Sequence, residues 1–361
     1  MKKVGILTFQ NTFNFGALLQ NYALFHTLEE LSFEPVVVNY RSEAVESGEG
    51  FAHPSTLKQM GMFLFMRRKA YLFDSFKHRY LFTPSVTRDG IRKICERLDC
   101  VVVGSDQVWN TKITHSDPTY FLDFIDDPRR CKTYAASMGY GELPPCDFDI
   151  RSLISHFSSL LVREKTAAET IIRECPDASE PKVVLDPTLL VKRSVWEEIE
   201  QLPRYAPDNS YILVYDVSES GLAFDAARSL ATKSNAQIIR IQSYDLKPRP
   251  GIKSVLNVSP EEYLGLFAHA RSTVVSSFHG LCFSIINHRD FYFSGQTTGN
   301  NTNSRATDLM DLLGITGRTV NDLADGAVDP IDWDAVEARL CELRADSLQL
   351  LIDSLSDVED E

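Results

Sequence analysis

Val4-Gly-Ile-Leu-Thr-Phe9 opens the stretch that decides the fold, and Pro35-Val-Val-Val-Asn39 closes it. Both are short apolar runs rich in β-branched residues, a pattern typical of buried strands. Between them lie a polar loop at 10–16 and a segment at 17–31 whose leucine and alanine residues recur at helical spacing. Parallel strands need a helical crossover between them, so this stretch predicts a βαβ unit.

The same alternation of strands and helices continues along the chain and restarts after an interruption. Further strands are expected at 100–104, 133–136, 159–162 and 183–185, and later at 211–217, 237–242 and from Thr273 onward, with a strand or a loop near 254–258. The interruption is the segment 201–209, whose two prolines indicate a linker. Nearly continuous apolar strands between helices are typical of parallel sheets covered on both faces. We therefore predict an α/β protein of two halves with a cleft between their strand ends.

The length of 361 residues supports this division, because a single core rarely grows so large. We expect an N-terminal domain at 1–204, a C-terminal domain at 205–330, and an amphipathic helix with a frayed acidic tail at 331–361. Other helices are expected at 220–233, 260–269 and 306–313.

The composition excludes several classes of protein. A formal net charge of −13 argues against nucleic acid as a partner. No segment reaches the roughly 18 consecutive apolar residues of a membrane span, and no cleavable leader is evident. The seven cysteines contain no C-x-x-C pair, which predicts a reduced, cytoplasmic protein without a zinc site or other metal.

A basic and aromatic segment within the first half, a helical insertion at about 57–82, stands out in this acidic chain. One interpretation is a surface helix that touches anionic lipid head groups or a lipid-linked substrate, a peripheral contact at the inner face of the membrane. The other is an insertion that packs its Phe and Leu side chains on the domain while its charges face water.

Polar loops follow four of the expected strands, and in open parallel sheets such loops face one crevice. In the first loop, the amides of Asn11 and Asn14 would bind a ligand, and Gly16 would let backbone N–H groups approach it; alternatively they stabilise a turn. The loop after residue 104 supplies hydrogen-bonding groups and an indole suited to a sugar, from Ser105, Asp106, Gln107, Trp109 and Asn110. The alternative there is a helix cap beside a packed Trp. No nucleotide-binding glycine motif is present.

Two arginines are candidates for binding an anion. Arg163 follows an apolar run, and its planar guanidinium suits a carboxylate or phosphate; the alternative is an internal salt bridge, with Glu164 for example. Ser304 and Arg305 open an expected helix and form a second candidate anion site. The alternative for these two is an N-cap at the end of a Gly/Asn/Thr-rich loop, 294–303.

The stretch Arg271-Ser-Thr-Val-Val-Ser-Ser-Phe-His-Gly280 carries the strongest candidate for catalysis. An apolar strand ends in two serines, and His279 then begins a second apolar run with helical character. An imidazole beside a helix N-terminus suits acid–base chemistry next to an anion. A hydrogen-bonded core histidine is the alternative.

Several of these segments together resemble the polysaccharide pyruvyl transferase family, in order from residue 4 to about 320. The segments are Ile6-Leu-Thr-Phe9, Asn14-Phe-Gly-Ala-Leu-Leu-Gln-Asn-Tyr-Ala-Leu24, Val103-Gly-Ser-Asp-Gln-Val-Trp-Asn110, Tyr134-Ala-Ala-Ser-Met-Gly139, Val162-Arg-Glu-Lys165, Leu185-Asp-Pro-Thr-Leu189 and Ser276-Ser-Phe-His-Gly280. The resemblance implies a GT-B-like pair of Rossmann-type domains with parallel sheets facing an interdomain cleft. It also implies phosphoenolpyruvate as co-substrate, with no other cofactor. The pyruvyl unit would pass to two hydroxyls of a sugar, in a polysaccharide or lipid-linked glycan, with release of phosphate.

Carried over to this chain, the resemblance makes His279 the general acid. Donor-binding residues would be Arg163, Ser277, Gly280, Ser304 and Arg305; acceptor-binding residues would be Asn11, Asn14, Gly16, Ser105, Asp106, Gln107, Trp109 and Asn110. The chain departs from the family in having Ser277-Phe-His279 where an Arg-Leu-His triplet is expected, and Arg305 would supply the missing charge. Two rival functions stay open: a GT-B glycosyltransferase using a nucleotide sugar, and a non-catalytic glycan-binding descendant.

Overall fold

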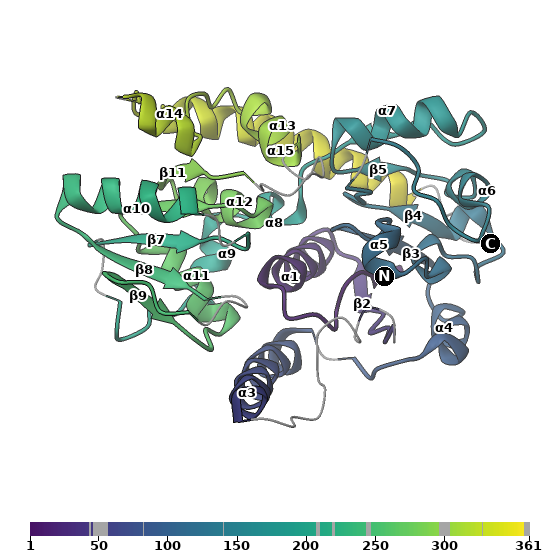
Figure 1. The fold of residues 1–361 in the computed structure, drawn as a ribbon. Coiled ribbons are helices and arrows are strands. Elements are labelled where there is room, and N and C mark those ends of the chain that lie inside the picture. Colours follow the sequence, from purple (N-terminus) through teal and green to yellow (C-terminus); the bar gives the residue numbers. More distant parts are fainter. Residues whose placement is uncertain are drawn as a thin grey trace. The chain divides into compact units, whose positions relative to one another are not determined.

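The structure is a computed structural model, shown in Figure 1, in which the chain forms two compact units. It describes residues 1–42, 45, 57–81, 83–139, 141–206, 210–218, 221–242, 247–295, 304–326 and 328–356. Unit 1 comprises Met1–His53, Lys77–Val191 and Cys341–Glu361, and unit 2 comprises Pro54–Phe76 and Lys192–Leu340.

Unit 1 is built on a parallel sheet that begins with the predicted βαβ unit. Its strands are β1 (Lys3–Leu7), β2 (Glu34–Val37), β3 (Cys100–Val103) and β4 (Cys131–Thr133), in the order β2-β1-β3-β4. A further parallel pair, β5 (Leu161–Val162) and β6 (Lys182–Val183), is joined to it by bridges beside β4. The order of strands reverses at β1, so the carboxyl ends of β1 and β3 flank the switch point.

Helices between these strands bury the apolar side chains of the unit. They are α1 (Phe15–Glu30), α4 (Arg88–Cys95), α5 (Thr111–Thr114), α6 (Ile150–Ser155), α7 (Lys165–Glu174) and α8 (Pro187–Leu190), with 3-10 turns η1 (Pro118–Phe121) and η2 (Pro128–Arg130). Helix α1 packs against α8 and β2. Burial raises the pKa of the Cys95 and Cys131 thiols to about 12, as expected for thiols that serve as core residues.

Unit 2 carries a five-stranded parallel sheet with a similar reversal of order. Its strands are β7 (Tyr211–Tyr215), β8 (Gln237–Ile241), β9 (Ile252–Val255), β10 (Ser272–Val275) and β11 (Asp290–Phe293), in the order β11-β10-β7-β8-β9. The switch point lies between β7 and β10, two neighbouring strands whose connections run in opposite directions.

The helices of unit 2 cover both faces of this sheet (Figure 1). They are α9 (Arg193–Glu197), α10 (Gly221–Ser234), α11 (Pro260–Ala268), α12 (Phe278–Ile286), α13 (Ser304–Leu312) and α14 (Val320–Asp325). Helix α10 packs with α14, and α11 packs with α12. A capping box at Ser259 and Glu262 fixes the start of α11.

Two long helices contribute residues to both units. Helix α3 (Leu57–Tyr80) belongs to unit 2 as far as Phe76 and to unit 1 from Lys77, and α15 (Trp333–Ser356) passes from unit 2 to unit 1 at Cys341. Within unit 1, α15 is anchored to the segment after β6. The Leu185 N–H donates to Ser347 Oγ at 3.0 Å, and Arg344 Nε donates to the Leu189 carbonyl at 2.9 Å.

Most expected elements lie where the sequence places them, with three differences. Strand β11 was not anticipated. The units divide between Val191 and Lys192, earlier than the expected boundary at 204/205, because α9 packs in unit 2 through an edge contact of Trp196 with Phe283 at 5.1 Å. The insertion expected wholly in the first domain divides between the units. The acidic tail at 357–361, most of the loop at 294–303 and part of the 201–209 linker lie outside the described residues.

The length and hydropathy of the helices bear on membrane contact. Across the part of the chain that the structure describes, none combines enough length with enough apolar character to cross a bilayer.

Gly265 tests the packing of α11 in unit 2. A Cβ at this position would overlap the backbone carbonyl of Gln201 and lie 2.8 Å from Leu202 N, both backbone atoms that cannot rotate away. We expect Gly265→Ala to lower the free energy of unfolding by about 1–3 kcal/mol, as overpacking does. Urea unfolding followed by circular dichroism measures the change.

Gly221 provides the matched control, since a Cβ there would meet no atom within 4 Å. In Gly221→Ala the helix propensity of alanine should leave stability unchanged or raise it by up to about 1 kcal/mol. Equal destabilisation by the two substitutions would contradict the packing described for Gly265.

Candidate active site

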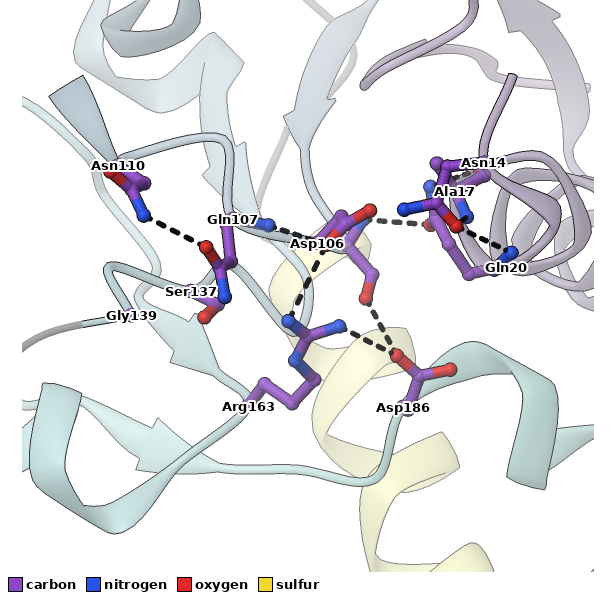
Figure 2. Close-up of polar contacts among 12 residues, drawn as sticks. Asn14, Ala17, Gln20, Asp106, Gln107, Asn110, Ser137, Gly139, Arg163 and Asp186 are labelled. Carbon is purple, nitrogen blue, oxygen red and sulfur yellow. Dashed lines mark hydrogen bonds and ion pairs between the residues drawn. The ribbon is translucent and has the colours of Figure 1, made fainter. Parts of the chain in front are cut away.

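A network of polar side chains lies at the carboxyl edge of the sheet in unit 1, at its switch point (Figure 2). Ser105, which follows β3, is held on three sides. Its N–H donates to Gln20 Oε1 at 3.1 Å, its carbonyl accepts from Thr8 Oγ1 at 2.9 Å, and its hydroxyl donates to Asp186 Oδ2 at 3.0 Å. The ends of β1, β3 and β6 are thereby tied to one another and to α1.

Arg163 occupies the centre of this network, between Asp106 and Asp186 in Figure 2. Its nitrogens lie 3.1 Å from Asp186 Oδ2, 3.6 Å from Asp106 Oδ1 and 3.9 Å from Glu164 Oε2, and its side chain is 1% exposed. Burial lowers the pKa of this guanidinium, but the three carboxylates, with Asp186 first, outweigh that effect and raise the pKa above its ordinary value.

This geometry corrects the assignment of Arg163 to the donor. The guanidinium is enclosed and faces three internal carboxylates, so the alternative of an internal salt bridge is the one that the structure shows. Glu164 in turn binds the turn after β4, where its Oε1 accepts from Ser137 Oγ at 2.8 Å and Met138 N at 3.2 Å. The role of Arg163 is to neutralise these acids and fix the strand ends.

The asparagines of the first loop, which follows β1, also form hydrogen bonds to neighbouring groups of the protein. Asn14 caps α1, and its Oδ1 accepts from the N–H groups of Gly16 at 2.9 Å and Ala17 at 3.4 Å. Asn11 Nδ2 donates to Asn39 Oδ1 at 3.0 Å and to the Tyr40 carbonyl at 3.1 Å. The backbone groups that were expected to approach a ligand at Gly16 therefore serve the cap, which is the turn-stabilising alternative.

In the loop after β3, Trp109 is a core residue rather than a platform for a sugar. It is 0% exposed, its ring stacks on Phe121 at 5.6 Å, and its Nε1 donates to the Tyr120 carbonyl at 3.0 Å. Asn110 caps α5 and donates to Gln107 Oε1 at 2.8 Å. The stacking role predicted for Trp109 is wrong, because the ring is buried within the domain core.

The second group of predicted residues lies at the switch point of unit 2. Ser276, directly after β10, accepts from the N–H of Val217 at 2.9 Å, and its own N–H donates to the Tyr215 carbonyl at 3.2 Å. These bonds hold the end of β10 against the end of β7. The first turn of α12 is thus fixed at the place where ligands bind in open parallel sheets.

His279 is the second residue of α12 and is 7% exposed. Ser277 is the N-cap, and its Oγ accepts from the N–H of Gly280 at 3.0 Å. A Cβ at Gly280 would lie 2.8 Å from that oxygen and 3.1 Å from Val275 Cβ, so glycine lets the helix start close to the strand. Ser277 and Gly280, both predicted to bind the donor, thus build the turn that carries His279, and the Gly280 N–H serves the cap.

Phe278 links the histidine to a cation. Its ring lies 5.4 Å from the His279 ring at an interplanar angle of 79°, and the Arg305 guanidinium lies 5.7 Å from the Phe278 ring centroid. Arg305 is half-buried on the first turn of α13, which begins at Ser304. The structure therefore brings the predicted Arg305 and His279 to one aromatic ring within unit 2.

Sequence reasoning missed several residues of these two groups. Asp186 and Ser137 stand in segments that carry the family resemblance, and an acid directly after a strand was the available signal for Asp186. Gln20 also stands in such a segment, but its position inside the expected helix gives no sign that it contacts the end of a strand. The sequence also gives no indication that Phe278 contacts both His279 and Arg305.

A separate cavity of about 530 Å³ lies in unit 2 between the end of α13 and the start of α15. Arg318, Asp322 and Asp329 are among its lining residues, and none of the predicted site residues lines it. Among the described residues, no group of three or more His, Cys, Asp or Glu side chains has a metal-binding arrangement.

A family model for polysaccharide pyruvyl transferase matches residues 14–293, a range that includes Arg163, Asp186 and His279 but not Asn11, Ser304 or Arg305. The match spans well over half of the chain. This chain belongs to the polysaccharide pyruvyl transferase family. No curated protein is similar enough to the chain to match it.

Among solved structures, two similar ones are those of a sugar-nucleotide epimerase and of a UDP-bound protein. UDP-GlcNAc 2-epimerase from Neisseria meningitidis, bound to UDP-GlcNAc, has 9% identity and a TM-score of 0.50, covering 98% of this chain and 99% of its own. MnaA of S. aureus with UDP has 12% identity and a TM-score of 0.50, covering 94% and 91%. These likenesses concern the fold alone, and they confirm the predicted GT-B-like α/β class of this family member.

Arg163 allows a test that separates a structural role from ligand binding. In Arg163→Met the three carboxylates lose their buried partner, so we expect the free energy of unfolding to fall by about 3–5 kcal/mol. Urea unfolding without any ligand measures it. A guanidinium that served a ligand would instead lose affinity at unchanged stability, and that result would contradict the structural role of Arg163.

Arg173 is the matched control, because it pairs with Glu174 at 2.8 Å on the surface with more than half of its side chain exposed. Arg173→Gln should change stability by less than about 1 kcal/mol. If Arg163→Met does not fold, Asp106→Asn provides a milder change in the same network.

Proposed function

We propose that this family member transfers the pyruvyl unit of phosphoenolpyruvate to two hydroxyls of one sugar and releases phosphate. The acceptor would be a sugar of a polysaccharide or of a lipid-linked glycan precursor. The observation that carries the proposal is His279 on the first turn of α12, at the switch point of unit 2 and inside the segment that matches the family model.

Charge around His279 supports an anionic donor. The N-terminus of α12 carries a partial positive charge, and Arg305 adds a full one beside Phe278. Phosphoenolpyruvate carries a carboxylate and a phosphate, and a guanidinium binds either through paired hydrogen bonds. Arg305 thus takes the place of the arginine that the family has at the position of Ser277.

The proposed reaction begins with a proton transfer from His279 to the methylene carbon of phosphoenolpyruvate. The adjacent carbon becomes an oxocarbenium-like centre, and the first sugar hydroxyl attacks it, forming a C–O bond and returning its proton to His279. The bond from this carbon to the phosphate oxygen then breaks. The second hydroxyl closes the ketal, and its proton leaves with the phosphate.

Unit 1 would hold the acceptor at the carboxyl edge of its sheet. Asp106, Gln107 and Asn110 are fixed there by hydrogen bonds and the ion pair with Arg163. Hydrogen-bonding groups with fixed rotamers suit the recognition of sugar hydroxyls, because little side-chain entropy is lost on binding. Trp109 supports this edge from the core and does not face the sugar.

Replacement of His279 tests the proton transfer. General acid catalysis contributes about 10²–10⁴-fold, so His279→Gln should lower the rate of phosphate release by at least about 100-fold while phosphoenolpyruvate still binds. The rate is measured with phosphoenolpyruvate and a panel of glycan acceptors. Wild-type turnover in His279→Gln would refute the assignment.

His288→Gln is the matched control, since His288 is exposed and lies 3.5 Å from Glu337. It should keep the wild-type rate. Absence of phosphate release from the unaltered protein across the acceptor panel would favour the non-catalytic alternative.

Arg305→Gln tests the binding of the donor. Loss of a charge-assisted hydrogen bond costs about 1.5–3 kcal/mol, so the affinity for phosphoenolpyruvate should fall by about tenfold or more. Thermal-shift titrations measure this change, with Arg228→Gln as a surface control. Stabilisation of the unaltered protein by nucleotide sugars and not by phosphoenolpyruvate would support a glycosyltransferase instead.

A further inference from the structure

Helix α3 combines basic and apolar residues, and the site described above does not account for this combination. Its 24 residues contain six lysines or arginines and one acidic residue, Asp74, although the whole chain has a net charge of −13. None of the residues assigned to catalysis lies on it. The charge of this helix therefore needs a separate explanation.

One face of α3 is buried at helical spacing. Met66, Phe73 and Phe76 have 4%, 0% and 0% of their surfaces exposed, and Lys69 lies on the same stripe. Residues three, four and seven apart share a face of a helix, so these side chains seat α3 on the protein. To this extent the packing interpretation of the segment is correct.

The opposite face is exposed and is not purely polar. Leu64 is 60% and Tyr71 is 71% exposed, and the exposed Arg67 and Arg68 lie between them on the same face. Apolar residues thus occur on both sides of the helix, which explains why the sequence shows no single apolar stripe. Packing on the protein accounts for one side only.

The pattern on the exposed side fits a bilayer surface. Arginines attract anionic head groups, while a leucine and a tyrosine enter the boundary between head groups and acyl chains. Helix α3 cannot span the membrane, because charged residues occupy its middle. A helix with these properties lies in the plane of the interface.

We propose that the exposed face of α3, formed by Leu64, Arg67, Arg68 and Tyr71, docks the protein on a bilayer that contains anionic lipids. This face of α3 is cationic although the protein as a whole is acidic. Charge complementarity therefore favours an anionic bilayer over a neutral surface as its partner. The proposal does not depend on pyruvyl transfer. If the proposed transfer is also correct, docking would bring the protein to the surface where a lipid-linked acceptor is found.

Vesicle sedimentation of the full chain tests the docking. The protein should bind vesicles of phosphatidylcholine with phosphatidylglycerol, bind vesicles of pure phosphatidylcholine at least tenfold more weakly, and lose binding as salt is added. Replacing Arg67 and Arg68 by Gln should weaken binding to the anionic vesicles by about tenfold or more. Replacing Leu64 and Tyr71 by Ser should also weaken it, and this loss should persist at low salt.

Arg92→Gln with Arg129→Gln is the matched control, because it removes the same charge from exposed positions outside α3. This double variant should bind the anionic vesicles like the unaltered protein. Circular dichroism and urea unfolding establish that every variant is folded.

Three outcomes would overturn the proposal. They are equal binding to the two kinds of vesicle, equal losses in the α3 and control variants, and full retention of binding by the Leu64 and Tyr71 variant. Displacement from vesicles by a soluble anionic polysaccharide at low concentration would point to a polymer-binding face instead. Phosphate release with a water-soluble acceptor, measured in parallel, shows whether a failure concerns docking or catalysis.

Discussion

One buried cation organises the carboxyl edge of unit 1. Arg163 lies among the carboxylates of Asp106, Glu164 and Asp186, and each of these acids belongs to a different strand-end segment. A buried charge without a partner is far more costly than a paired one, so the loss of any one of the four groups destabilises the arrangement of the others. The positions of Ser105, Gln107 and the turn after β4 follow from this arrangement through direct hydrogen bonds. The polar edge is held in place because each buried charge is stabilised by an opposite charge from another strand end.

Unit 2 fixes its functional turn by different means. Backbone and hydroxyl groups join β7, β10 and α12 at Ser276 and Ser277, and the missing side chain of Gly280 allows a close approach. His279 and Arg305 both contact Phe278. In the proposed reaction, His279 would deliver a proton and Arg305 would hold the anionic donor. The two units thus fix their strand ends differently: charge pairing holds those of unit 1, and hydroxyl and backbone hydrogen bonds hold the switch point of unit 2.

Local patterns predicted much of this fold and less of the site. The βαβ unit, the restart at Tyr211 and the strand–serine–histidine junction follow from the hydrophobic period and from turn residues. Strand β11 was not predicted because it is only four residues long and begins at the end of the polar run Asn287-His-Arg-Asp290, although its aromatic residues favour a strand. Whether Arg163 faces a ligand or internal acids depends on residues distant in sequence, and so does the burial of Trp109. Both outcomes are set by tertiary packing, which a single sequence does not display.

Helix α15 has a consequence for the order in which the protein can mature on the ribosome. Its residues follow the strands of unit 2 in sequence, yet Ser347 and Arg344 bind the backbone at Leu185 and Leu189, on both sides of Asp186. Domains generally fold as their residues emerge, from the N-terminus onward. In this chain the backbone on both sides of Asp186 gains these two hydrogen bonds only after the residues of unit 2 have been synthesised, so the nascent first half exposes these backbone groups while the second half is being made.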